Sequence, residues 1–577
     1  MRDSLFCRRG TLPAARLDFS VRRELARHLL TVAHGPRLAD CAGSSVSFVV
    51  CCCHLCLLMS MVLNPLLNHD DLRRWRACSR RFWLYRRRDP AADGTAHTAT
   101  AADASAEAAV VHGPDADAAL RASFPLADTI AQPKSHAEWV QAMHHTLTCL
   151  DAEHMLAEGW AVLGACLTSE DRAQVRIDVL TRGTRGLCLY KVRYATVAED
   201  SDVDAVALWT HVAAKCGLRI QSVGLLLVNT DFIYPGHACY AGVFREVDLA
   251  PVLGSRPVAA WLAAMRDCAR GAEPPATPGE HCTKGGGCEF AHSCQARAPA
   301  PHAPLADPQA SLEVVGRELA AELRAAGHVD LHSVAPASLQ NARHRRAVRA
   351  VQQGAPVLEP EAAALMQALP YPRHYLRFDT IGFAVPIWPG TRPYQVLPFQ
   401  WTCDVQGADG QWQRHHFLAD AQGGDPRRAF ASTLLQVLGD SGAVLAYNAG
   451  FEGNRIRELA RQFDDLAPAL EAVLPRIVDL FQVARSHYYH PVMAGSWSFK
   501  SISRAVAPNV ALGMEGPDGV AESSAQATFS RSLQRGLEDA VRQQLRAALC
   551  AHGQRQTEVL RRLALVLAGN AADGDGV

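Results

Sequence analysis

The stretch HYLRFDTIGF, His374–Phe383, decides how the C-terminal part of this chain is expected to fold. Apolar side chains alternate with Arg377 and Asp379, which predicts a largely buried strand. Because side chains two residues apart on a strand point to the same face, Arg377 and Asp379 are expected side by side. An arginine beside an aspartate on such a strand makes this face the first place to look for a functional site.

The segments that follow extend this strand into a sheet. YQVLPFQWTCDV (394–405) and QWQRHHFLAD (411–420), separated by QGADG, predict an antiparallel three-stranded meander with it. Asp425 and Pro426 predict the N-cap and first turn of a helix that ends at Gly439. Its apolar positions share one face: Phe430, Leu434, Val437 and Leu438. The strand AVLAYN (443–448), the helix GNRIRELARQF (453–463) and a long last helix complete the order βββαβα, which is that of an RNase H-like fold.

Length and composition limit the rest of the interpretation. A chain of 577 residues is too long for one core, which predicts two to four domains. With 58 basic and 58 acidic residues, bulk charge does not favour nucleic acid or a membrane as partner. The 18 cysteines form no secreted-type framework, which favours a reducing, cytoplasmic location.

One segment argues against that location. VSFVVCCCHLCLLMSMVL (46–63) carries no charge and reaches the lower length limit for a membrane span. It is read here as part of an over-long start assignment, with an anchor, a signal region and a buried helix as alternatives.

Low-complexity stretches divide the chain into five parts. These are 1–60, an over-long start or hydrophobic segment; 61–294, an α/β domain with a disordered insert at 89–118; 295–370, a linker and helical region; 371–568, the βββαβα domain; and 569–577, a disordered tail. In the first domain, residues 175–197 and 222–236 each predict two strands, and 204–218 predict a helix ending near Gly217. In the third part, ELAAELRAAG (318–327) and NARHRRAVRAVQ (341–352) predict helices.

A family resemblance sharpens the expectation for 371–568. FQWTCDV, DPRRAFASTLLQVLGDSG, AVLAYNAGFEGNRIRELA, RIVDLFQVARSHYYHP and GSWSFKSI resemble a DEDD-type exonuclease domain, and more closely the bacterial family named domain of unknown function 2779. The resemblance implies phosphodiester hydrolysis by two divalent ions, Mg²⁺ or Mn²⁺, held about 4 Å apart by four acids.

Only part of that acid set is present. At the first strand's two acid positions stand Arg377 and Asp379, and the NAGFE turn keeps Glu452. On the last helix His552 matches the aromatic or histidine position, but Gln556 replaces the aspartate. The resemblance therefore assigns Asp379 and Glu452 as remnant catalytic and metal-binding acids.

Arg377 changes what these acids are expected to do. A cation in place of a carboxylate turns attraction for a metal ion into repulsion of several kcal/mol, even at an effective dielectric constant of about 20. We therefore expect loss of the nuclease site, with Arg377 and Asp379 neutralising each other. A weak single-metal site and a solvated position for Arg377 are the alternatives. Asp479 is expected to be structural, and Glu558 is expected to point away from the site.

Four cysteines suggest a cofactor in the first domain. Cys78 is followed much later by Cys282, Cys288 and Cys294, an arrangement that resembles RecB-like PD-(D/E)xK nucleases with a 4Fe-4S cluster. Zinc is an alternative, because His281 and His292 lie in the same stretch, and so is the absence of a metal.

The same resemblance implies a second degraded metal site. Asp178 fits the first acid, but Lys191 occupies the glutamate position and Arg193 the lysine position of the Glu-x-Lys motif. Trp209 lies where the family carries glutamine. Asp178 is therefore either a remnant catalytic and metal-binding acid or an ordinary strand-end acid.

Basic and aromatic residues between positions 73 and 88 suggest nucleic-acid contact. The candidates are Arg73, Arg74, Arg76, Arg80, Arg81 and Trp83. The alternative is an arginine-rich helix that stacks on its own core. The run RHRRAVR (343–349) is read as a solvated helix face.

Together these patterns predict a two-domain protein, PD-(D/E)xK-like and then RNase H-like, of nuclease ancestry. The leading expectation is DNA or RNA binding, or scaffolding, without hydrolysis. A working metal-dependent nuclease and an interaction protein without nucleic-acid binding are the alternatives.

Overall fold

The structure is a computed structural model with a mixed α/β architecture. It describes residues 66–88, 112–113, 115–150, 159–282, 287–291, 294, 308–420, 424–515, 521–522 and 524–570. This part does not include the apolar segment 46–63, residues 571–577 of the predicted tail, or most of the predicted insert and linker. None of the helices it describes is both long and apolar enough to cross a membrane.

The N-terminal part is built on a six-stranded sheet in the order β1-β2-β3-β4-β5-β6. The strands are β1 (Ala127–Thr129), β2 (Ala161–Thr168), β3 (Gln174–Arg182), β4 (Leu187–Arg193), β5 (Ile220–Val228) and β6 (Phe244–Asp248). The β1/β2 and β4/β5 pairs are parallel and the other pairs antiparallel. The accompanying helices are α3 (His69–Ala77), α4 (Ser79–Arg87), α6 (Ala116–Ser123), α7 (His136–Cys149), α8 (Asp200–Lys215), α9 (Ala250–Leu253) and α10 (Val258–Arg270).

The apolar core of this part lies between the sheet and its helices. Val206, Trp209 and Val212 of α8 are buried against Ile177 and Leu189 of the sheet. This spacing of three residues places the apolar side chains on one face of α8. The predicted helix at 204–218 is confirmed, and the chain leaves it through Gly217 at φ +81°.

Two boundaries predicted in this part are wrong. Residues 222–236 contribute one strand, β5, and not two, because 229–236 instead form a loop whose Tyr234 N–H donates to the carbonyl of Thr391 (3.0 Å). The predicted disordered insert also extends too far, because α6 begins at Ala116, which is buried beside Val385. Alanine-rich sequence is as compatible with a packed helix as with disorder when a tertiary surface covers it.

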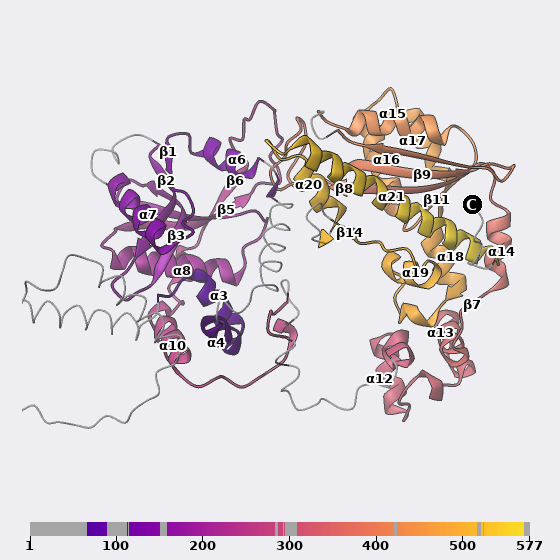
Figure 1. Ribbon diagram of the computed structural model, residues 1–577, viewed down its shortest axis with the longest axis horizontal. Helices are drawn as coiled ribbons and strands as arrows, with labels where there is room; N and C mark the ends of the chain where they lie inside the picture. The colour runs from indigo at the N-terminus through magenta and orange to yellow at the C-terminus, as the bar shows by residue number, and fades with distance from the viewer. Residues whose placement is uncertain are drawn as a thin grey trace, which may run out of the picture.

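The C-terminal part is built on a five-stranded sheet in the order β10-β9-β8-β11-β12 (Figure 1). The strands are β8 (Arg373–Ile381), β9 (Leu397–Gln406), β10 (Trp412–Leu418), β11 (Ala443–Ala446) and β12 (Ile477–Asp479). The predicted antiparallel meander is confirmed, and β11 joins β8 in parallel. Short pairs are formed by β7 (Val357–Leu358) with β13 (Tyr488–Tyr489), and by β14 (Met514–Glu515) with β15 (Ala521–Glu522).

Helices cover both faces of this sheet (Figure 1). The helices of the C-terminal part are α12 (Arg317–Ala325), α13 (Ala342–Gln353), α14 (Pro360–Gln367), α15 (Arg427–Leu438), α16 (Gly450–Gln462), α17 (Ala467–Val473), α18 (Leu480–His487), α19 (Phe499–Val506), α20 (Ala525–Ser532) and α21 (Asp539–Leu567), and of these α15, α16 and α21 pack directly on the sheet. Leu376 and Phe378 of β8 pack against α15 and α16. The odd-numbered residues of β8, including Arg377 and Asp379, face α21, as the period of two requires.

The helices largely follow the predicted pattern. α15 ends at Gly439, as predicted, but it begins at Arg427, and Pro426 holds the N-cap position. The Asp425 carboxylate still accepts from the backbone N–H of Arg427 (3.0 Å), so it satisfies one free donor of the first turn. The run 343–349 is not simply solvated, because Arg346 is 3 % exposed and its Nε lies 3.3 Å from the Glu359 carboxylate.

Candidate functional site

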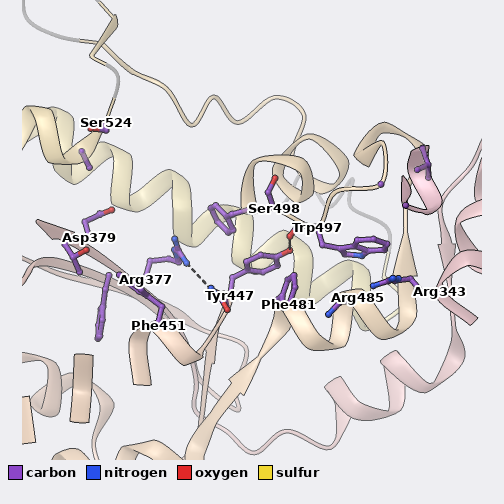
Figure 2. A pocket seen from close by; sticks show the side chains of 18 of the residues that line it. Arg343, Arg377, Asp379, Tyr447, Phe451, Phe481, Arg485, Trp497, Ser498 and Ser524 are labelled. Carbon is purple, nitrogen blue, oxygen red and sulfur yellow. Dashed lines mark hydrogen bonds between the residues drawn. The ribbon is translucent and has the colours of Figure 1, made fainter. Parts of the chain in front are cut away.

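A cavity of about 1130 Å³ opens beside β8 in the C-terminal part. Its wall comes from β8, the turn after β11, α18, the segment leading into α19, the start of α20 and the start of α13. Figure 2 shows Arg377 and Asp379 at one side of this cavity and Arg343 and Arg485 at the other. The aromatic side chains of Tyr447 and Phe481 lie between them (Figure 2), and Phe499 also lines the cavity.

Arg377 contacts residues of four segments: the turn after β11, α16, α19 and α21. Its Nη1 lies 3.4 Å from Oε1 of Glu452 and donates to the carbonyl of Tyr447 at 3.3 Å. Its Nε donates to Oε1 of Gln556 at 3.3 Å, and its guanidinium lies 4.6 Å from the centre of the Phe499 ring. The predicted neutralisation by Asp379 is thus corrected: the ion pair of Arg377 is with Glu452.

Glu452 is a buried acid in the first turn of α16, directly after a tight turn at Asn448. Asn448 adopts a left-handed conformation (φ +62°), and this turn directs the first turn of α16 and its Glu452 beneath β8. The Glu452 carboxylate is 1 % exposed, and its Oε2 has no hydrogen-bond partner within the described part. Burial raises the pKa of Glu452 to about 7, against the opposing effect of Arg377. Glu452 therefore holds its proton to a higher pH than an ordinary glutamate does.

The side-chain amide of Gln556 joins Asp379 to Arg377 by hydrogen bonds. Nε2 of Gln556 donates to Oδ1 of Asp379 at 3.4 Å, while the other end of the same amide accepts from Arg377. Burial raises the pKa of Asp379, and His552 and Arg377 oppose that rise. An aspartate at position 556 has no donor for Asp379, so the glutamine suits a site that contains both a cation and a carboxylate.

His552 completes this group. Its Nε2 lies 2.6 Å from Nε2 of Gln556, and because an amide nitrogen only donates, His552 accepts with this atom. Burial lowers the pKa of His552, so its neutral form is favoured. We call Arg377, Asp379, Glu452, Gln556 and His552 the Arg377 cluster.

The Arg377 cluster does not fit a two-metal site. Arg377 contacts one of the two remaining acids directly and lies within electrostatic reach of the other. Two divalent ions need several anionic oxygens, and the guanidinium already takes up much of the available negative charge. In the described ranges, no group of three or more His, Cys, Asp or Glu side chains is arranged to hold a metal ion.

Two other acids of this part have structural partners. Oδ1 of Asp479 accepts from the backbone N–H of Asn448 (2.9 Å) and of Phe481 (3.0 Å), so it fixes the turn before α16 and caps α18. Glu558 contacts Arg561 and Arg562 on its own helix. Both positions agree with the roles expected from sequence.

The second acid site predicted from sequence is also rich in cations. Oδ2 of Asp178 accepts from the backbone N–H of Val192 at 2.9 Å, and burial raises its pKa although Lys191 opposes this. Lys191 lies 3.9 Å from Asp202 and 5.6 Å from the centre of the Trp209 ring. Arg193 contacts the same Asp202 at 3.4 Å. Lys191 and Arg193 are therefore partnered by Asp202, which sequence reasoning missed.

His69 is a further member of this site that sequence reasoning missed. Burial and the nearby Lys191 lower its pKa to about 4, while Asp202 acts in the opposite sense. Its position on α3 places it far from β4 in sequence, and only a signal that α3 packs on α8 could have identified it.

The four candidate cofactor cysteines lie in one region of the N-terminal part, but the described thiols are not arranged as the ligands of a common metal ion. Burial raises the pKa of Cys294, and the nearby Cys78 and Cys282 thiols add to the rise. Cys282 likewise contributes to the raised pKa of Cys288, for which burial is the main cause. No three of the described thiols are arranged around a common ion. The iron-sulfur cluster and its zinc alternative therefore stay predictions.

Most arginines of α3 and α4 have partners inside the protein. Arg76 contacts Asp204 (2.9 Å), Arg80 contacts Glu273 (2.5 Å) and Arg81 contacts Glu289 (2.6 Å). The remaining candidates are also engaged: Arg73 with Asp70 (3.5 Å), Arg74 over the Tyr85 ring (3.5 Å), and Trp83 donating from Nε1 to the carbonyl of Gly271 (3.0 Å). This arrangement favours the structural alternative for these helices, and nucleic-acid contact there stays a prediction.

A second group of cations in the cavity was not recognised from sequence. Arg343 lies in the first turn of α13 and Arg485 in the last turn of α18, and both line the cavity. We call Arg343, His344, Arg485 and Trp497 the Arg343 end of the cavity. The run 343–349 suggested only a solvated helix face, because nothing in it indicates that α13 packs beside α18.

Comparison with known proteins supports one part of this description. A family model described as Domain of unknown function (DUF2779) matches residues 374–498. No curated protein and no solved structure gave a match. The matched range begins in β8 and includes Arg377, Asp379 and Glu452, but it ends before α21 and covers a minority of the chain. Over this range the chain is similar to a family of unknown function, across the strand and turn that hold Arg377, Asp379 and Glu452.

Proposed function

We propose that this protein binds single-stranded DNA or RNA in the cavity beside β8 without hydrolysing it. The observation that supports this proposal is the ion pair of Arg377 with Glu452. By the sequence resemblance, Arg377 stands at a position where the nucleases carry a metal-binding acid. A guanidinium attracts a phosphate but does not activate water as a metal ion does.

The lining of the cavity supports a single-stranded ligand. It combines guanidinium groups that suit phosphates with aromatic rings on which bases stack. Phe451 is 37 % exposed at the cavity wall, which leaves its ring accessible. The element order β8-β9-β10-α15-β11-α16 is also the order expected of an RNase H-like fold, and nuclease ancestry rests on that order and on the resemblance.

The test is equilibrium binding of the full chain to a labelled single strand of about ten nucleotides. The observed association constant is expected to fall with salt, since each phosphate contact contributes about −0.7 to the slope of log K against log salt concentration. Phe451→Ala is expected to weaken binding by about 5- to 100-fold. Leu565→Ala is the matched control, because Leu565 is 38 % exposed and does not line the cavity. Absence of binding would leave only the interaction-protein alternative.

A working nuclease is the second candidate, and the survival of two acids in the Arg377 cluster favours it. The Asp379 carboxylate is close enough to Glu452 to add to the rise in the pKa of Glu452. Strand cleavage that needs Mg²⁺ or Mn²⁺ and is lost in Asp379→Asn would establish this candidate in place of the first. Asp178→Asn tests the N-terminal site in the same way.

The cofactor proposal is separate from both. Four thiolates suit an iron-sulfur cluster. The effects of Cys78 and Cys282 on the pKa of Cys294, and of Cys282 on that of Cys288, support the proximity of these thiols. Iron and acid-labile sulfide measured in anaerobically purified protein, with zinc measured in parallel, decide between the two metals.

A further inference from the structure

The Arg343 end of the cavity carries positive charge that the described residues do not balance. Arg343 and Arg485 come from different helices, and their mutual repulsion adds to burial in lowering the pKa of Arg343. Within the described part of the chain, neither guanidinium forms an ion pair with a carboxylate. Glu313, the acid that lines this end, is instead paired with Arg324. Like charges held together at a cavity wall favour the binding of an anion.

The side chains of this end are positioned before any ligand arrives. The Arg343 guanidinium lies 5.6 Å from the centre of the Trp497 ring, and Arg485 lies 5.8 Å from that of Phe481. Nε1 of Trp497 donates to the Tyr488 carbonyl at 3.4 Å, which fixes the indole. Stacking on a fixed ring reduces the conformational entropy that an arginine loses when it binds a ligand.

His344 adds a neutral group beside the two cations. Its Nε2 lies 3.3 Å from Nη2 of Arg343, and because a guanidinium only donates, His344 accepts with Nε2. Burial, with Arg343 as a second cause, lowers the pKa of His344, so the ring is neutral at neutral pH. The two arginines are then the cations of this end.

Two adjacent guanidinium groups match a dianion better than a monoanion. A phosphodiester carries one negative charge, whereas a phosphomonoester carries close to two at neutral pH. Arginine also recognises phosphate oxygens with two parallel hydrogen bonds, which lysine does not. Figure 2 shows the rings of Tyr447 and Phe481 between this end and the Arg377 cluster, and together with Phe499, which also lines the cavity, they give an apolar wall for a nucleoside.

We propose that the Arg343 end is a binding site for the phosphomonoester group of a nucleotide. Arg343 and Arg485 bind the phosphate, and Trp497 is a positioning residue. Two sources carry this group: the phosphorylated end of a single strand and a free nucleoside monophosphate. The strand version deepens the proposed function and rests on it, whereas the free nucleotide does not.

The test compares four probes on the full chain at one salt concentration. They are a short oligothymidylate with a 5′-phosphate, the same strand with a 3′-phosphate, the same strand with hydroxyl ends, and thymidine 5′-monophosphate. Arg343→Gln and Arg485→Gln are the test variants. Arg428→Gln is the matched control, because Arg428 forms an exposed pair with Asp465 and does not line the cavity.

One phosphorylated strand is expected to bind about tenfold or more tightly than the hydroxyl strand, and each test variant is expected to reduce that preference about tenfold. The control variant should keep it. Trp497→Phe should keep most of the preference and Trp497→Ala should reduce it. A thermal unfolding midpoint near that of the wild type establishes that each variant is folded.

The remaining outcomes separate this inference from the proposed function. Arginine-dependent binding of thymidine monophosphate without binding of any strand supports the site and overturns the proposed function. Equal binding of phosphorylated and hydroxyl strands overturns the site and leaves the proposed function intact. No binding of any probe overturns both.

Discussion

Nη1 of Arg377 lies 3.4 Å from the buried carboxylate of Glu452, and this ion pair occupies the centre of the face that β8 presents to α21. Breaking a buried pair leaves an uncompensated charge, which costs more than the pair itself contributes. The pair therefore makes the fold sensitive to changes at either residue.

Glu452→Gln is expected to change how stability depends on pH. Because burial raises the pKa of Glu452 to about 7, the folded protein holds a proton between about pH 4.3 and 7 that the unfolded chain has released. The free energy of unfolding of the wild type therefore falls as pH rises through this range, by at most about 1.4 kcal/mol per pH unit from this group. In Glu452→Gln this pH-dependent part of the free energy of unfolding should be absent, which urea unfolding measured from pH 4.5 to 8 would show. If the free energy of unfolding of Glu452→Gln depends on pH as steeply as that of the wild type, Glu452 is not buried as described.

Arg377→Gln is expected to destabilise the protein more at high pH than at low pH. Removing the guanidinium leaves Glu452 without its cation, and above pH 7 the carboxylate is ionised. The free energy of unfolding should fall by about 3 kcal/mol at pH 8 and by less at pH 5, where Glu452 is protonated. In Arg428→Gln, whose ion pair is exposed, the loss in free energy of unfolding should be the same at pH 8 and pH 5. Equal losses at both values argue against the pair.

Gly553→Ala is expected to push α21 away from the sheet. A methyl group at Gly553 would lie 2.2 Å from Oγ1 of Thr402 and 2.6 Å from Nε2 of Gln400, both on β9. Gln400 has little freedom to yield, because its Nε2 donates to the carbonyl of Leu549 (2.8 Å). We expect a loss of about 1 to 3 kcal/mol in the free energy of unfolding.

The control for that substitution is Gly513→Ala, since nothing lies within 4 Å of a methyl group at Gly513. Chemical denaturation should place this variant within about 0.5 kcal/mol of the wild type. If both glycine variants are equally stable, α21 does not pack on β9 as described.

Asp479→Ala is expected to lower stability, because Asp479 caps α18 and holds the Asn448 turn. The loss should be about 1 to 2 kcal/mol, as for other lost helix caps. Asp479→Asn keeps an acceptor oxygen and should retain most of the stability. If Asp479→Ala unfolds at the wild-type denaturant concentration, the structural assignment of Asp479 is wrong.

Much of the C-terminal fold was predictable from local pattern. The alternation in His374–Phe383 identified β8 and correctly placed Arg377 and Asp379 on one face, because the period of two is a property of any strand. Gly439 marked the end of α15 for a similarly local reason.

The partners of the charged residues were not predictable in this way. Arg377 was expected to neutralise Asp379, its neighbour on the strand, yet its carboxylate partner comes from α16, 75 residues further along the chain. Arg343 and Arg485 likewise meet only because α13 and α18 pack together. Long-range packing decides such pairs, and a single sequence carries little signal for them.

The most direct test of the central claim is to incubate the full chain with a labelled single strand in Mg²⁺ and then Mn²⁺, and to measure both the bound fraction and the strand length. The wild type is predicted to bind the strand and leave it intact, and Arg377→Asp combined with Gln556→Asp is the variant in which cleavage can reappear. Shortening of the strand by the wild type, abolished by Asp379→Asn, would contradict the account.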